Sequence, residues 1–136
     1  MTLSVTQLPP ALAGDSTSVI AAALASGATV VRGVPGSTYS VTTLTVPAGV
    51  TLEQCTLVQI TATTGNLVTL GAGSVLRDCS LDGNASNQSA SNDGVRLNPG
   101  SGGAVSRVSV TNTKGVGISA MYVKESGTGV TGWAAK

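Results

Sequence analysis

Six carboxylates are the acidic groups that this chain of 136 residues offers for chemistry, and the chain contains no histidine. Two of them, Asp82 and Asp93, flank a polar segment in the middle of the chain. Glycosidic bond hydrolysis commonly uses two carboxyl groups about 5 to 9.5 Å apart across a cleft. Asp82 and Asp93 are therefore the only pair that we consider as catalytic candidates, provided that the fold brings them to one flank of the molecule.

The neighbouring residues favour a simpler interpretation of this pair. Asp82-Gly83 and Asn92-Asp93-Gly94 are sequences that commonly form turns. No two acidic residues are adjacent, and a calcium-dependent lyase would need a basic residue clustered with several acidic ligands. Arg77-Asp78 is a single doublet, for which a solvent-facing position is the simpler explanation. We expect no catalytic residue within this chain.

The segment between the two aspartates, Gly83 to Asp93 (GNASNQSASND), has no apolar residue larger than alanine. We therefore expect it to project from a corner of the fold without adding to the core. It is the best candidate in the chain for contact with a ligand or a neighbouring subunit. The side chains that can hydrogen-bond to sugar hydroxyls are Asn84, Asn87, Gln88, Asn92 and Asp93. The alternative is an insertion that is tolerated because loop closure costs little entropy.

Composition excludes several classes of function. The net charge is +1 and only 10% of the residues are charged, whereas a nucleic-acid-binding protein needs a basic stripe. The aromatic residues are too scattered to stack bases. The longest apolar run, Val19 to Ala25, is far shorter than the roughly 20 residues of a membrane-spanning helix. Two cysteines without metal-ligand spacing predict no metal site, and we expect no cofactor.

One pattern is written three times between Leu44 and Val110: GVTLEQCTL (49–57), GSVLRDCSL (73–81) and GAVSRVSV (103–110). Their apolar positions align in three columns, and pairs of apolar residues upstream align as well. The columns are Leu52, Leu76 and Val105; Cys55, Cys79 and Val108; and Leu57, Leu81 and Val110; the upstream pairs are Leu44/Val46, Val68/Leu70, Val95/Leu97 and Val116/Ile118. Such a repeat indicates a solenoid, in which neighbouring units supply each other's core.

Alternation of apolar and polar residues within each repeat predicts short strands with one buried face. The step of three residues from Leu52 to Cys55 breaks this alternation and requires a bend, and Pro47-Ala48-Gly49 provides another break. Three short strands and three corners per repeat predict an all-β, three-sided parallel β-helix of about four to five turns. Cys55 and Cys79 then stack in the core. We expect them to be free thiols, because parallel neighbours lie about 4.8 Å apart, which is too far for a disulfide bond.

Upstream of the repeats, residues 1–14 are expected to be an extended lead-in, since Pro9-Pro10 disfavours a helix. Asp15 or Ser16 can cap a short helix in 15–27, with Val19, Ile20, Ala23 and Leu24 on one side and Gly27 at its end. We expect this helix to cover the first turn of a solenoid that occupies 28–136. The chain is expected to be the N-terminal part of a longer solenoid.

The segments GDSTSVIAAALASG (14–27), TVVRGVPGSTYSV (29–41) and LTVPAGVTLEQ (44–54) follow one another directly. This order resembles the opening of pectate-lyase-like right-handed β-helix proteins, which typically have a D-S/T helix, a strand ending at P-G-x-Y and a strand before P-x-G-V-x-L. The opening is frequent in bacteriophage tailspikes and tail fibres, and VTQLPPA (5–11) resembles segments that precede such domains in phage tail proteins. The resemblance covers roughly 5–110 and implies a right-handed β-helix in a homotrimer.

We therefore expect a structural and recognition component of a phage tailspike or tail fibre, located in the virion and made in the host cytoplasm. Its partners would be other phage tail proteins and a bacterial surface polysaccharide, with no nucleic acid and no membrane. The alternative is the N-terminal part of a polysaccharide-degrading hydrolase or lyase whose catalytic residues lie outside this chain. LDGN (81–84) and NDGV (92–95) faintly resemble stretches of polygalacturonase-like hydrolases. A bacterial adhesin or an ice-binding solenoid is a third possibility.

Overall fold

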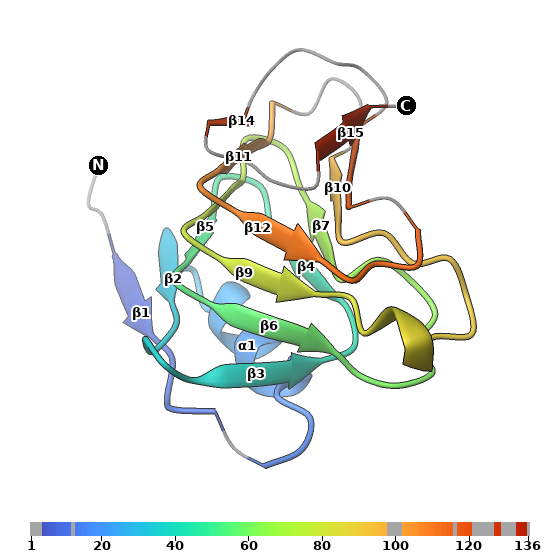
Figure 1. Ribbon diagram of the computed structural model, residues 1–136. Coiled ribbons are helices and arrows are strands. Elements are labelled where there is room, and N and C mark those ends of the chain that lie inside the picture. The colour runs from blue at the N-terminus through green and yellow to red at the C-terminus, as the bar shows by residue number, and fades with distance from the viewer. Residues whose placement is uncertain are drawn as a thin grey trace.

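The structure is a computed structural model that describes residues 4–11, 13–97, 102–115, 117–120, 127–128 and 133–135. The described part of the chain is an all-β fold of parallel sheets with a single α-helix (Figure 1). Its elements are β1 (Val5–Gln7), α1 (Thr17–Leu24), β2 (Val30–Arg32), β3 (Thr38–Val41), β4 (Leu44–Val46), β5 (Thr51–Glu53), β6 (Thr56–Gln59), β7 (Val68–Leu70), β8 (Val75–Arg77), β9 (Ser80–Asp82), a 3-10 turn (Ala85–Asn87), β10 (Val95–Leu97), β11 (Ala104–Ser106), β12 (Ser109–Thr111), β13 (Ile118–Ala120), β14 (Gly127–Thr128) and β15 (Trp133–Ala135).

The strands form three sheets, and from β2 to β14 the chain visits them in a fixed cyclic order. Sheet A has the strand order β1-β2-β5-β8-β11-β14, sheet B has β3-β6-β9-β12, and sheet C has β4-β7-β10-β13-β15. We call one passage through A, B and C a layer; β5, β6 and β7 form one such layer. In Figure 1 the strands of sheet B lie one above another, and the chain rises through the stack from its N-terminus to its C-terminus. All pairings between strands are parallel among the described residues.

The apolar columns that the repeats predict are confirmed. Leu52 pairs with Leu76, and Leu76 with Val105, in sheet A, and all three side chains are fully buried. The other two columns are buried as well, and the pairs Leu44/Val46, Val68/Leu70 and Val95/Leu97 align in sheet C. Each layer therefore buries its apolar residues against the same positions of the layers before and after it.

The bend between sheets A and B lies where the three-residue step predicts it. Gln54, Asp78 and Arg107 occupy this corner in successive layers, and each has a left-handed backbone with φ between 50° and 56°. One left-handed residue between two extended strands turns the chain sharply without an intervening loop, although it is costly for a residue with a Cβ. Backbone hydrogen bonds continue across the corner, because Gln54 N–H donates to Arg77 O, and Asp78 N–H to Ser106 O.

The expected alignment of Val116/Ile118 with Val95/Leu97 is wrong. Val95 pairs with Ile118, and Leu97 with Ala120, which is a shift of two residues; Val116 lies outside the described residues. A shift of two keeps the same side chains inward, so the apolar pattern fits both registers. Backbone hydrogen bonds fix the register in which Val95 pairs with Ile118, because Gly115 N–H donates to Asn92 O and Val95 N–H donates to Gly117 O.

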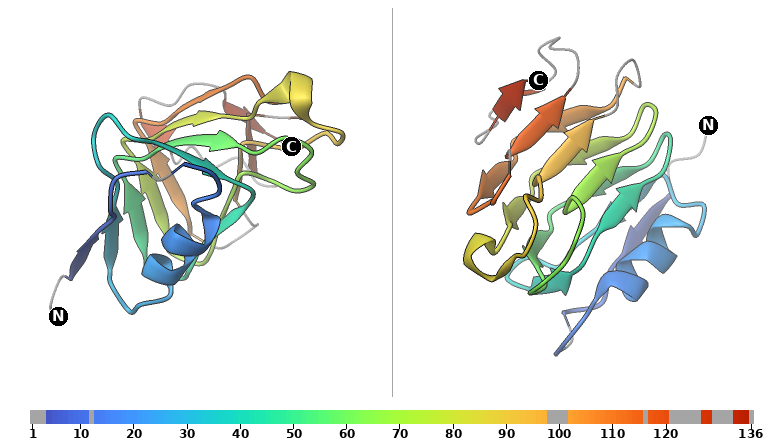
Figure 2. Two further views of the ribbon diagram at one scale, coloured as in Figure 1. Left: turned by 90° about the horizontal axis from the view of Figure 1, so that it is seen from below. Right: turned by 90° about the vertical axis from the view of Figure 1, so that its right-hand side faces the viewer.

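The N-terminal segment adds a strand and a helix to the first layer. β1, within the expected lead-in, pairs with β2 at the edge of sheet A. Helix α1 lies at the same end of the stack, beside β4, as both views of Figure 2 show. Its Ile20 and Leu24 side chains are buried in the apolar core. Asp15 accepts a hydrogen bond from Thr17 N–H through its side chain, so it satisfies a free amide of the first turn.

Truncation of Leu76 to alanine tests the stacked core. Leu76 is fully buried between Leu52 and Val105, so Leu76→Ala should lower the free energy of unfolding by about 2–5 kcal/mol. Thr56→Ala, on the outward side of β6, is the control and should stay within about 0.5 kcal/mol of the wild type. Urea unfolding followed by circular dichroism measures both values. Equal losses in the two variants would contradict the assigned inward column.

Candidate functional site

The two candidate carboxylates have different surroundings. Asp82 is half-buried on the outward side of β9, and its Oδ1 accepts hydrogen bonds from Asn84 N–H at 2.8 Å and from Asn112 Nδ2 at 3.0 Å. Asp93 is buried, and its backbone N–H donates to Asn66 Oδ1 at 3.2 Å. The Asp82 carboxylate thus stabilises the loop conformation around Asn84 and Asn112, which is what its turn-forming sequence predicts.

The polar segment folds back onto the layer beneath it. Gln88 and Asn92 are buried, and together with Gln59 and Thr63 they form a cluster that we call the amide network. Asn92 Nδ2 donates to Thr63 O at 2.6 Å and to Gln59 Oε1 at 3.2 Å, while its Oδ1 accepts from Gly65 N–H at 3.1 Å. The network joins the segment to the loop that follows β6.

Gln59 is the centre of the amide network, and it is the residue that sequence reasoning missed. It pairs with Val41 at an inward position of sheet B and is fully buried. Its Nε2 donates to Thr42 O and Gly65 O, each at 3.0 Å. Gln88 completes the network, because its Oε1 accepts from Thr63 N–H at 2.9 Å. No buried side-chain nitrogen or oxygen of the described residues is left without a partner.

The expectation that the polar segment adds nothing to the interior is therefore wrong. Loops that leave the sheets carry peptide groups without a partner in a strand ladder, and these groups must be satisfied when they are buried. The amide side chains of Gln88 and Asn92 satisfy them. Of the five candidate contact residues, Gln88, Asn92 and Asp93 are buried, Asn84 is half-buried and Asn87 is exposed.

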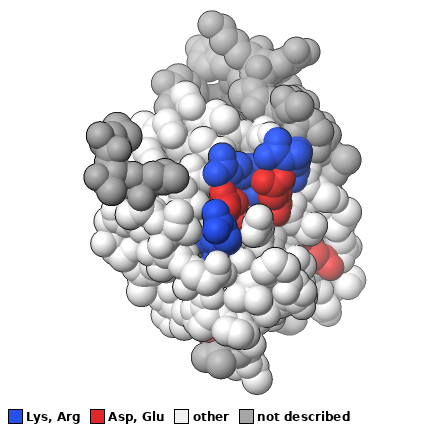
Figure 3. Space-filling view, turned by 90° about the vertical axis from the view of Figure 1, so that its left-hand side faces the viewer, with Lys and Arg blue, Asp and Glu red and all other residues white. Residues whose placement is uncertain are grey.

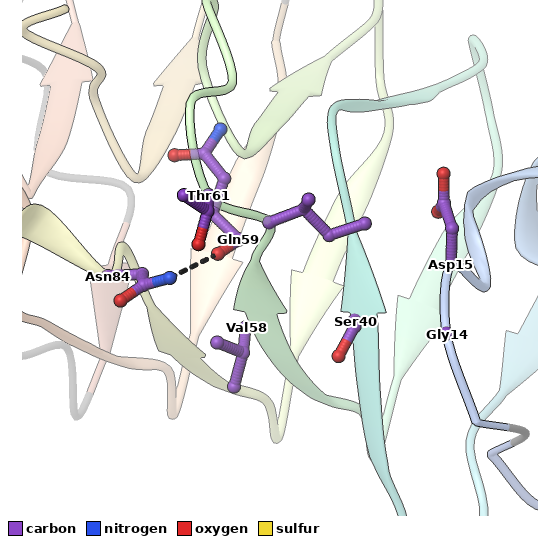
Figure 4. A pocket seen from close by; sticks show the side chains of 8 residues that line it. Gly14, Asp15, Ser40, Val58, Gln59, Thr61 and Asn84 are labelled. Atoms are coloured by element: carbon purple, nitrogen blue, oxygen red, sulfur yellow. Dashed lines mark hydrogen bonds between the residues drawn. The ribbon is translucent and has the colours of Figure 1, made fainter. Parts of the chain in front are cut away.

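A shallow depression of about 480 Å³ lies on sheet B between the polar segment and the N-terminal lead-in (Figure 4). Val58 and Ile60 contribute apolar surface to it, and its remaining lining offers hydroxyl, amide and carboxylate groups. The lining residues are Gly14, Asp15, Ser40, Val58, Gln59, Ile60, Thr61 and Asn84. Apolar surface bordered by a few hydrogen-bonding groups is the arrangement by which proteins bind small polar ligands.

Two polar side chains stand on opposite sides of this depression. Asn84 Nδ2 donates to Gln59 O at 3.1 Å, which holds the amide against β6. Asp15 is on the other side, where the hydroxyl and then the backbone N–H of Thr17 donate to its carboxylate and lower its pKa. Asp15 therefore presents a charged acceptor at neutral pH. Among the five sequence candidates, Asn84 is the residue that lines this depression.

Charged side chains gather on the outward face of sheet A (Figure 3). Arg32, Glu53 and Arg77 are paired in register on β2, β5 and β8, so their side chains form one column. Arg32 Nε lies 2.7 Å from Glu53 Oε2, and Arg77 Nη2 lies 2.6 Å from Glu53 Oε1. Both oxygens of Glu53 thus accept hydrogen bonds from arginines of the adjacent layers.

Asp78 and Arg107 extend this column at the corner after sheet A. Arg107 Nε and Nη2 donate to the two oxygens of Asp78 at 2.6 and 3.1 Å. We call Arg32, Glu53, Arg77, Asp78 and Arg107 the charge stripe. Arg77 and Asp78 face outward with partly exposed side chains, as the sequence suggested, but each is also ion-paired with a residue of a different layer. The spacing of Arg32, Glu53 and Arg77 matches the repeat and could have revealed the column.

The carboxylate of Glu53 stays ionised although only 5% of its side chain is exposed. Burial alone would raise its pKa, but the hydrogen bonds and charges of Arg32 and Arg77 together outweigh burial and lower the pKa. The two arginine side chains remain about 40% exposed, so the cations keep much of their hydration while they compensate the buried anion. Glu53 holds both arginines in fixed orientations.

Cys55 and Cys79 are free and buried, as expected. A hydrogen bond with Cys55 and then burial raise the pKa of Cys79 well above its ordinary value, so this thiol is protonated. A buried thiol is a poor nucleophile and fills space in the core. The described residues contain no group of three or more histidine, cysteine or acidic side chains that could hold a metal ion.

Comparison of the chain with protein-family models, with curated proteins and with solved structures finds no match. In the part of the chain that the structure describes, no helix has the length and apolar character required to cross a membrane. Function must therefore be argued from the parallel sheets, the depression on sheet B and the charge stripe on sheet A.

Replacement of Asn92 tests whether the polar segment is structural. Asn92→Ala should lower the free energy of unfolding by about 1–3 kcal/mol, because Thr63 O and Gly65 N–H lose their buried partner. Asn87→Ala removes an exposed amide from the same segment and should change stability by less than about 0.5 kcal/mol. Both values come from urea unfolding. Indistinguishable stabilities of the two variants would show that the segment is expendable.

The lowered pKa of Glu53 predicts the direction of a pH effect. The carboxylate stabilises the folded state fully above its ordinary pKa of 4.5, and this contribution is lost as the pH falls through the lower folded-state value. Glu53→Gln should therefore be less stable than the wild type at pH 7, and the difference should shrink below pH 4.5. Thr51→Ala, on the same strand and side, is the control. Thermal unfolding at a series of pH values measures the effect, and a difference that is constant with pH would contradict it.

Proposed function

We propose that this chain forms a right-handed parallel β-helix in the shaft of a trimeric phage tailspike or tail fibre. Its place would be the virion, and its partners would be other tail proteins and a bacterial surface polysaccharide. Helix α1 would be the cap of the β-helix, since it lies beside β4 at the N-terminal end of the stack and buries Ile20 and Leu24. Capping protects the first layer from pairing with other chains.

The observation that carries this proposal is the in-register stacking of equivalent residues over successive layers. Four complete layers occur in the described part of the chain, and each contributes one strand to each of the three sheets. The corner residues Gln54, Asp78 and Arg107 repeat one backbone conformation at the same place in three successive layers. A stack of this kind gives a stiff rod whose sides present regular rows of side chains. A shaft that carries recognition surfaces requires both properties.

The depression on sheet B supports the recognition part of the proposal. Its hydroxyl, amide and carboxylate groups border the apolar side chains of Val58 and Ile60. Sugars have apolar ring faces and hydroxyl edges, which such a surface can contact together. Asp15 and Asn84 would accept and donate hydrogen bonds to sugar hydroxyls at its two sides.

Sedimentation equilibrium tests the oligomeric state. The chain should have three times its monomer mass of 13.3 kDa at micromolar concentration, because a short stack of layers buries little surface by itself. Leu76→Ala provides a control for folding, since a trimer that depends on folded layers should dissociate when the core is weakened. A monomer mass for the well-folded wild type at this concentration would contradict the trimer.

A further inference from the structure

The charge stripe has hydrogen-bonding capacity that its internal ion pairs leave unused. Three guanidinium groups face two carboxylates, so the stripe has one net positive charge. In the hydrogen bonds of the described residues, Arg32 donates only through Nε, to Glu53, and its two Nη groups point to no internal acceptor. The arginine side chains are 40%, 41% and 60% exposed. Their remaining N–H groups are therefore available to an external anion.

The carboxylates of the stripe fix the arginines in place. Glu53 accepts from Arg32 and Arg77, and Asp78 accepts two hydrogen bonds from Arg107. A long side chain normally loses rotamer freedom when it binds a ligand, and arginines that are already oriented lose less. The stripe is thus preorganised for an acceptor with planar or tetrahedral oxygen groups.

The arginines are spaced along the stack. Layers lie about 4.8 Å apart, so Arg32 and Arg77, which are two layers apart, are separated by roughly 10 Å, and Arg107 belongs to the next layer. One small anion could reach only part of this array and would compete with Glu53 and Asp78. A polymer with an anionic group on successive units could contact several guanidinium groups at once, which raises its effective concentration at each.

A row of small outward side chains runs beside the charge stripe on the same sheet. Thr51, Val75 and Ala104 are paired in register on β5, β8 and β11, and each is half-buried. This row offers a narrow and mostly apolar strip parallel to the arginines. The apolar faces of sugar rings can lie on such a strip while their carboxylates meet the guanidinium groups. An acidic polysaccharide fits both rows, whereas a flexible acidic peptide uses only the charges.

We propose that the outward face of sheet A binds an acidic polysaccharide that lies along the stack, with its carboxylates contacted by Arg32, Arg77 and Arg107. This inference rests on the proposed function as a polysaccharide-recognising shaft and specifies the chemical class of the polymer. It places acidic polymer on sheet A, separate from the depression on sheet B. Binding depends on charge and therefore weakens as the salt concentration rises.

Isothermal titration with polygalacturonate at low ionic strength tests the proposal, with neutral dextran, monomeric galacturonate and poly-glutamate as comparison ligands. The wild type should bind polygalacturonate in a salt-dependent manner and more tightly than each comparison ligand. Arg107→Gln should weaken binding about two- to fivefold, since it removes one exposed charge contact. Arg96→Gln on β10 of sheet C removes the same charge from a different face and should leave binding unchanged.

A second variant, Arg32→Gln/Arg107→Gln, should weaken binding further, and Arg77 still pairs with Glu53 in it. Urea unfolding of each variant establishes that it is folded at the titration temperature. Equal binding of polygalacturonate and dextran, equal binding of poly-glutamate, or equal losses in Arg96→Gln and Arg107→Gln would overturn the proposal. Sedimentation of the same samples separates the two hypotheses: a trimer without acidic-polymer binding refutes this inference alone, whereas a monomer refutes the proposed shaft.

Discussion

In-register pairing of parallel strands is the constraint on which the rest of this structure depends. Once Leu52 is aligned with Leu76 and Val105, every other position of the layers is aligned as well. Short strands of two to four residues have few hydrogen bonds of their own, so no layer is stable alone. The left-handed residues Gln54, Asp78 and Arg107 maintain the alignment, because they turn the chain without adding a residue that would shift the next strand.

Alignment also determines which polar groups can be buried. Gln59 lies inward because it is two residues after Leu57 on β6 and pairs with the buried Val41 of β3, and an inward amide requires several partners. Thr42 O and Gly65 O accept from its Nε2, and Asn92 of the polar segment between β9 and β10 donates to its Oε1. Gln88 in turn accepts a hydrogen bond from Asn92. The polar segment therefore fills part of the interior with polar side chains and also forms part of the surface. A fully satisfied network of this kind also specifies one arrangement of the loops.

The two outward faces are different in character for the same reason. In-register pairing places equivalent residues of successive layers in one column. On sheet A this produces the column of alternating charge formed by Arg32, Glu53 and Arg77. Sheet B carries mainly hydroxyl side chains at its outward positions, such as Thr38, Thr56 and Ser80. The two faces, one with the charge stripe and one rich in hydroxyl side chains, are chemically distinct surfaces. Ligands of different charge can be assigned to them on that basis.

The sequence by itself determined the parallel sheets, their inward columns and the bend after Leu52, because these follow from the spacing of apolar residues, which is local and periodic. It did not determine the register of Ile118, since a shift of two residues leaves the inward set unchanged. It also left open whether Gln88 and Asn92 face solvent, and which arginines Glu53 contacts. These depend on residues from different layers meeting in space, and only the tertiary structure decided them.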